Sequence, residues 1–68
     1  MDLLQSTNRH AEIRCSLKDL LIINNALNEV CHGIDLPEFE IRMGTTLQNA
    51  KTLLGQVSVV IDNINEKI

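Results

Sequence analysis

The side chains able to hold a soft metal or to undergo redox chemistry are two cysteines and two histidines: His10, Cys15, Cys31 and His32. The cysteines form no CxxC pair, and the four residues match no familiar zinc-binding spacing. If the segment between the cysteines is helical, a rise of about 1.5 Å per residue separates the thiols by roughly 20 Å, which prevents a disulfide within one chain. We therefore expect no metal and no other cofactor, and we interpret Cys31 as a small apolar packing residue.

Carboxylates gather at Asp35, Glu38 and Glu40, shortly after His32. General acid–base catalysis or a hard cation needs such groups, but polar side chains are also ordinary at a corner between two helices. The three glycines are isolated, and none is followed by the Lys-Ser or Lys-Thr of a phosphate-binding loop. We therefore predict a protein that is not an enzyme, whose acidic corner (Asp35, Glu38 and Glu40) is free to contact a basic protein partner.

Length and charge narrow the class of protein further. The chain has 68 residues, of which 44% are hydrophobic and 1% aromatic, and it carries a net charge of −3. A chain this short buries only about 60% of the surface that its unfolded form exposes, so self-association is expected. The basic residues are scattered singly, which argues against a nucleic-acid or anionic membrane surface. No apolar run approaches the roughly 20 residues of a membrane span, so we expect a cytoplasmic protein.

The element that positions the cysteines is a helix predicted over residues 17–32. Ser16 is its expected cap, Asp19 places negative charge in the first turn, and Gly33 suits a left-handed C-terminal cap. Its apolar positions recur at spacings of three and four: Leu20, Ile23, Leu27 and Val30. Asn24 lies beside this stripe; we interpret it as a solvated residue at the edge, with an amide that fixes the register between helices as the alternative.

A second helix is predicted from a capping box at Thr45 and Gln48. Its stripe keeps a three-four spacing throughout: Leu47, Ala50, Leu54, Val57, Ile61, Ile64 and Ile68. Leu53 and Val60 widen the stripe on one side, so this helix is able to touch more than one neighbour. Gly55 and the β-branched run over residues 57–61 leave a break followed by a strand as the alternative.

The segment between these helices fits two structures. Asp35 with Glu38 resembles a capping box and Pro37 suits a first turn, which favours a short helix over residues 37–43 that ends at Gly44. The alternation of apolar and charged residues also fits a strand, which would pair with residues 12–15. We therefore predict a mainly α fold with two amphipathic helices and a short central helix. The alternative is β-α-β-α with a two-stranded sheet completed in a dimer.

The domain organisation is simple. We expect residues 1–10 to be a frayed polar lead-in and residues 11–68 to form a single helical domain. A short capped segment followed by a Thr-capped amphipathic helix resembles many small bacterial proteins of unassigned activity, and no family follows from it. We predict a protein–protein interaction module that forms a homodimer through its apolar helix faces. The predicted interface residues are Leu20, Ile23, Leu27, Val30, Leu47, Leu54, Val57, Ile61 and Ile64.

The alternative function is a helix-turn-helix DNA-binding regulator. Residues 39–51 have the outline of helix, glycine turn and helix. Side chains able to read bases stand at the start of the second helix: Thr46, Gln48, Asn49 and Lys51. Phosphate contacts supply most of the affinity of such proteins, and this acidic chain has few bases near that helix. We therefore rank this function second.

Overall fold

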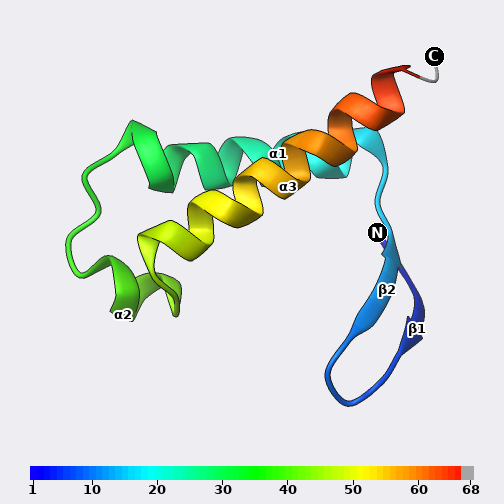
Figure 1. The fold of residues 1–68 in the computed structure, drawn as a ribbon, viewed down its shortest axis with the longest axis horizontal. Coiled ribbons are helices and arrows are strands. Elements are labelled where there is room, and N and C mark those ends of the chain that lie inside the picture. The colour runs from blue at the N-terminus through cyan, green and yellow to red at the C-terminus, as the bar shows by residue number, and fades with distance from the viewer. Residues whose placement is uncertain (67–68) are drawn as a thin grey trace.

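The computed structural model describes residues 1–66, with side chains to Ile64. Two strands, β1 (Asp2–Ser6) and β2 (Ala11–Arg14), precede the helix α1 (Leu17–Asn28), the π-helical turn η1 (Glu29–Gly33), the short helix α2 (Phe39–Met43) and the long helix α3 (Leu47–Glu66). Figure 1 shows this order along the chain. Helices hold 62% of the residues, so the predicted mainly α class, with two longer helices and a short central one, is confirmed.

The start of α1 is held by the expected cap in its complete form. The Ser16 hydroxyl accepts a hydrogen bond from the Asp19 amide at 3.0 Å, and the Asp19 carboxylate accepts one from the Ser16 amide at 3.2 Å. This capping box satisfies two backbone donors that the first turn leaves without helical partners.

The end of α1 differs from the prediction. The α-helix stops at Asn28 and continues as the π-helical turn η1, in which the Ile34 amide donates to the Glu29 carbonyl at 3.0 Å. This bond spans five residues, so Gly33 stays inside the widened turn. The prediction of a left-handed cap at Gly33 was wrong, because the positive φ angles among the described residues belong to Glu38 and Gly44.

The central segment is a helix, as favoured, and the strand alternative was wrong. It is shorter than expected because Glu38 has a left-handed backbone with φ of 55°, which interrupts the turn before Phe39. The predicted capping box at Asp35 and Glu38 is therefore absent: α2 begins without a side-chain cap. Gly44 ends α2 with φ of 71° and donates its amide to the Glu40 carbonyl at 2.9 Å, which confirms the predicted C-terminal cap.

The helix α3 runs without a break through Gly55, so the strand alternative for residues 57–61 was wrong. Its cap lies one residue later than predicted, because the hydroxyl that accepts a bond from the Asn49 amide is that of Thr46, at 3.1 Å. The Thr45 hydroxyl accepts a bond from the Asn49 side-chain amide, also at 3.1 Å. The stripe position Ile68 lies outside the described residues.

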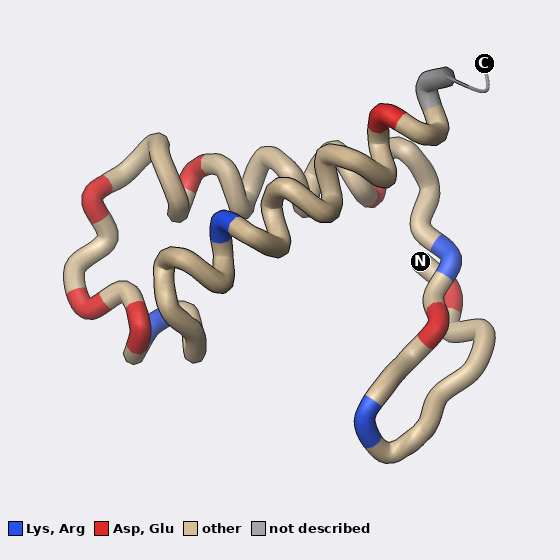
Figure 2. The backbone as a smooth tube through the Cα atoms, viewed as in Figure 1, with Lys and Arg blue, Asp and Glu red and all other residues tan. Residues whose placement is uncertain are grey.

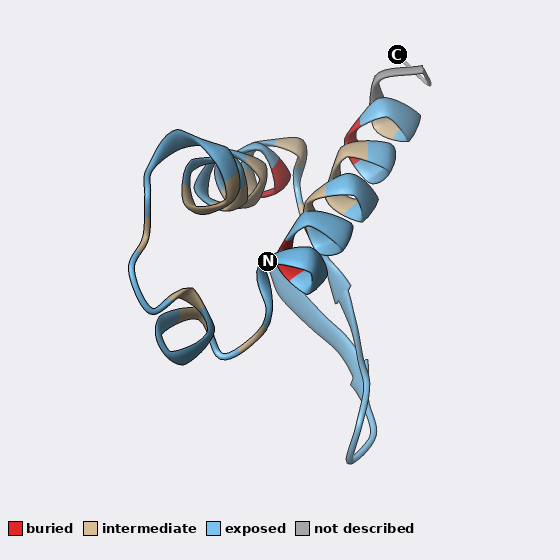
Figure 3. Cartoon of the chain, turned by 60° about the vertical axis from the view of Figure 1, so that its left-hand side comes forward, coloured by how far each residue is buried: buried red, intermediate tan, exposed pale blue. Residues whose placement is uncertain are grey.

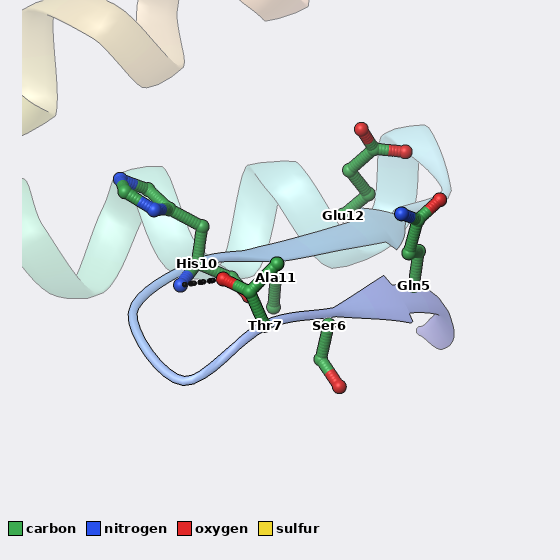
Figure 4. A pocket seen from close by; sticks show the side chains of 6 residues that line it. All are labelled: Gln5, Ser6, Thr7, His10, Ala11 and Glu12. Carbon is green, nitrogen blue, oxygen red and sulfur yellow. Dashed lines mark hydrogen bonds between the residues drawn. The ribbon is translucent and has the colours of Figure 1, made fainter.

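The first ten residues contain a strand rather than the expected frayed lead-in. β1 pairs with β2 antiparallel, from Asp2 opposite Arg14 to Ser6 opposite Ala11, and the register shifts by one residue at Leu4. Residues 12–15 therefore do not pair with the central segment. Hydrogen bonds close the turn of the hairpin: the Thr7 amide donates to the His10 carbonyl at 2.8 Å, and the Thr7 hydroxyl accepts from the His10 amide at 3.1 Å (Figure 4).

The elements form a flat, open arrangement. α1 and α3 run antiparallel, while the hairpin and α2 extend from the same side of this helix pair at opposite ends (Figures 1 and 3). The principal dimensions are 37 × 32 × 16 Å, and the radius of gyration is 13.5 Å, against about 11 Å for a compact domain of this length. The buried apolar residues are Leu20, Ala50 and Ile61, which lie on α1 and α3. The core is therefore a thin contact between two helices.

Candidate interaction surface

The contact of α3 with α1 and η1 is made by the stripes that the sequence predicted as an interface. Leu20 and Ile61 are buried, and Ile23, Leu27, Val30, Leu54, Val57 and Ile64 are half-buried. Leu47, at the start of α3, is 40% exposed. The centre of each stripe thus packs within one chain, and whatever contacts a second chain must use the residues that remain uncovered.

A polar contact fixes the two helices relative to each other. The Ser58 hydroxyl on α3 donates to the side-chain oxygen of Asn24 on α1 at 3.0 Å, in a partly buried position. Asn24 is half-buried, so its interpretation as a solvated edge residue was wrong and the alternative, an amide that fixes the helix register, fits better. Ser58, the partner of Asn24 in this contact, was not predicted from the sequence.

The opposite flank of α3 is uncovered. A step of about 100° per residue places Leu53 and Val60 on the side of α3 away from Ser58. Their side chains are 48% and 47% exposed. The same flank borders an open groove of about 460 Å³, whose apolar lining comes from Leu4 and Ile13 of the hairpin and from Leu20, Val60 and Ile64 of the helices. Arg14 and Cys15 complete the lining at the connection between the hairpin and α1.

The hairpin borders this groove but is itself exposed. Every residue of β1 and β2 is exposed, as the uniform pale blue of the hairpin in Figure 3 shows. A second hollow, of only about 60 Å³, is lined by polar residues near the hairpin turn, among them Gln5, Thr7, His10 and Glu12 (Figure 4). Its small volume leaves no room for an organic ligand. The larger groove is therefore the candidate binding surface.

The acidic corner lies at the other end of the molecule. Asp35, Glu38 and Glu40 are all exposed, and Figure 2 shows acidic positions in red along the connection from α1 to α2 and on α2. Within residues 1–64, no ion pair involves these three carboxylates; the ion pair there joins the Met1 amino group to Asp19 at 3.1 Å. The corner is free to meet a basic partner, and that contact stays a prediction.

The residues predicted to read DNA bases are only partly available. Thr46, Gln48, Asn49 and Lys51 are all exposed, but the Thr46 hydroxyl and the Asn49 side chain are bonded within the cap of α3. α2 has five residues, a single turn, where a helix-turn-helix protein needs a helix that packs against the recognition helix. The DNA-binding alternative stays a prediction with a weak geometric basis.

The described part of the chain offers little for a metal. It holds no group of three or more His, Cys, Asp or Glu side chains placed to share an ion. Cys15 and Cys31 are half-buried free thiols, and Cys15 lies on the groove. In the described helices, no stretch combines the length and the apolar character that crossing a membrane requires.

The groove was not predicted from the sequence, because the strand β1 was not predicted. A signal for the hairpin was present: the polar run from Ser6 to His10, with Asn8 inside it, has turn composition and separates two short segments that contain apolar residues.

Comparison with protein-family models, with curated proteins and with solved structures found no match to this chain.

Proposed function

We propose that this protein is a non-enzymatic, cytoplasmic interaction module that works as a homodimer formed through apolar helix faces. The observation that supports this proposal is the surface area of the single chain, 5493 Å². A folded monomer of 7.6 kDa exposes about 4,300 Å², so this chain exposes about 1,200 Å² more than its mass requires. A standard interface removes about 800 Å² from each partner, so the excess is large enough for the interface of a dimer.

The chemistry of the exposed residues supports the same proposal. Far more large apolar side chains are exposed than buried among the described residues, and they include Leu53 and Val60 on α3 and Leu4 and Ile13 on the hairpin. Leu4, Ile13 and Val60 line one groove, and contiguous apolar surface of this kind is uncommon on soluble monomers. Two free cysteines fit the reducing cytoplasm.

Light scattering behind a sizing column tests the homodimer, with the protein loaded over at least a tenfold range of concentration. We expect a mass of twice 7.6 kDa that falls toward the monomer mass only at the lowest concentrations. A monomer mass over the whole range would refute the proposal.

A further inference from the structure

The uncovered flank of α3 carries a stripe of its own. Leu53, Val57, Val60 and Ile64 follow one another at spacings of four, three and four, the spacing with which one helix packs along another. Val57 and Ile64 are half-buried at the edge of the contact with α1, whereas Leu53 and Val60 are about half exposed. We call these four residues the α3 flank. They form a helix-packing surface on which, within the described residues, Leu53 and Val60 stay exposed.

The groove beside the α3 flank extends this surface. Val60 and Ile64 of α3 line this groove together with Leu4 and Ile13 of the hairpin. An isolated two-stranded hairpin is at best marginally stable in water. A chain that filled the groove would cover apolar side chains of α3 and of the hairpin at once and would hold the hairpin in place.

The charges of α3 point to a second copy as the occupant. Between Leu47 and Ile64 the charged residues of this helix are Lys51 and Asp62. At about 100° per residue, both lie on the far side of α3 from Val60. Each copy has a net charge of −3, and like charges brought face to face would oppose association. An uncharged α3 flank lets two identical surfaces meet without that repulsion.

The area and the symmetry agree with this occupant. About 1,200 Å² of excess surface per chain exceeds the roughly 800 Å² that each partner buries in a standard interface. A stripe with three-four spacing is self-complementary, because its side chains fit between those of an identical stripe across a two-fold axis. We propose that a second copy of this chain packs its α3 flank against the first, with the groove beside the hairpin covered in the dimer. This inference rests on the proposed homodimer.

Two neighbouring valines provide the test. Val60 lies on the α3 flank. Val59 is 64% exposed and lies about 100° around the helix from Val60. We would compare Val60→Glu with Val59→Glu by light scattering, after circular dichroism has shown the same helix content in both. We expect V59E to keep twice the monomer mass and V60E to dissociate at least about 100-fold more readily, because moving a carboxylate from water into an apolar contact is unfavourable.

The outcomes separate this inference from the proposed function. If the V60E dimer is as stable as the V59E dimer, the assignment of the interface to the α3 flank is overturned, while the homodimer stands. A wild-type monomer would overturn both. If V60E does not fold, Leu53→Glu makes the same test at the other end of the flank, and an intact L53E dimer would overturn the assignment.

Discussion

The glycines of α3 and of the turn before it provide a paired prediction about stability. Gly55 lies in the middle of α3 on an exposed face, and a methyl group added to it would meet no atom within 4 Å. Glycine inside a helix costs about 1 kcal/mol relative to alanine, because the unfolded chain loses more conformational freedom. We therefore expect Gly55→Ala to raise the free energy of unfolding by about 0.5–1 kcal/mol. For a domain of this size, 1 kcal/mol corresponds to a rise in Tm of about 4–8 °C.

The same change at Gly44 is expected to have the opposite sign. A methyl group there also meets no atom within 4 Å, so steric contact does not distinguish the two positions. The difference is the backbone: Gly44 has φ of 71°, in the left-handed region that costs an alanine about 1–2 kcal/mol. We expect Gly44→Ala to lower Tm by a similar number of degrees.

Thermal unfolding followed by circular dichroism measures both variants. The wild-type protein and the variants must be compared at one protein concentration, because the Tm of a dimer depends on concentration. A lowered Tm for G55A would refute the reasoning and would mean that another chain covers Gly55. That result would also contradict the placement of the interface, since Gly55 lies about 140° around α3 from Val60.

The hydrogen bond between Asn24 and Ser58 is expected to contribute about 1 kcal/mol to the free energy of unfolding. Asn24→Ala and Ser58→Ala should therefore each destabilise the fold. A double-mutant cycle that shows no coupling between the two positions would contradict the contact. Hydrogen bonds to its carboxylate hold the pKa of Asp19 below its ordinary value of 3.8; the largest effect comes from the Met1 amino group, and the next from the Ser16 amide. Its stabilising effect is therefore present above that value and is lost as the pH falls through the lower folded pKa, so the Tm difference between wild type and Asp19→Asn should vanish in strong acid and persist at pH 7. In fluorescence anisotropy at about 50 mM salt we expect no binding to random duplex DNA, and binding there would revive the DNA-binding alternative.

The long helices were predictable because their signals are local and repeated. The three-four stripes of α1 and α3 and the cap at Ser16 depend only on residues within a few turns of one another. The helix ends were less predictable. Two neighbouring threonines, Thr45 and Thr46, both fit the cap of α3, and the choice between them depends on the backbone that leads from Gly44. Nothing in the spacing around Gly33 indicated that the helix would widen into a π-turn.

The hairpin was not predicted because neither of its strands has a buried face. Residues 2–6 lack the alternation of a half-buried strand, since Leu3 and Leu4 are adjacent and the register shift falls at Leu4. Such a strand is identified by its partner rather than by its own pattern. The groove, which needs both Leu4 and Ile13, was therefore missed even though the turn composition of residues 6–10 indicated a hairpin.

The sequence placed the predicted interface on the apolar stripes of both long helices, and the width of the stripe on α3 is why it did not choose one face of that helix. The strip of α3 that holds Ala50, Leu54 and Ile61 is covered within the chain, where α3 contacts α1 and η1. Leu53 and Val60 fall outside the strip, while Val57 and Ile64 border both surfaces. In the proposed dimer these shared residues would pack against α1 and the second copy together. Folding and association would then be coupled, and the thin α1–α3 core would gain stability from the same contact that joins the chains.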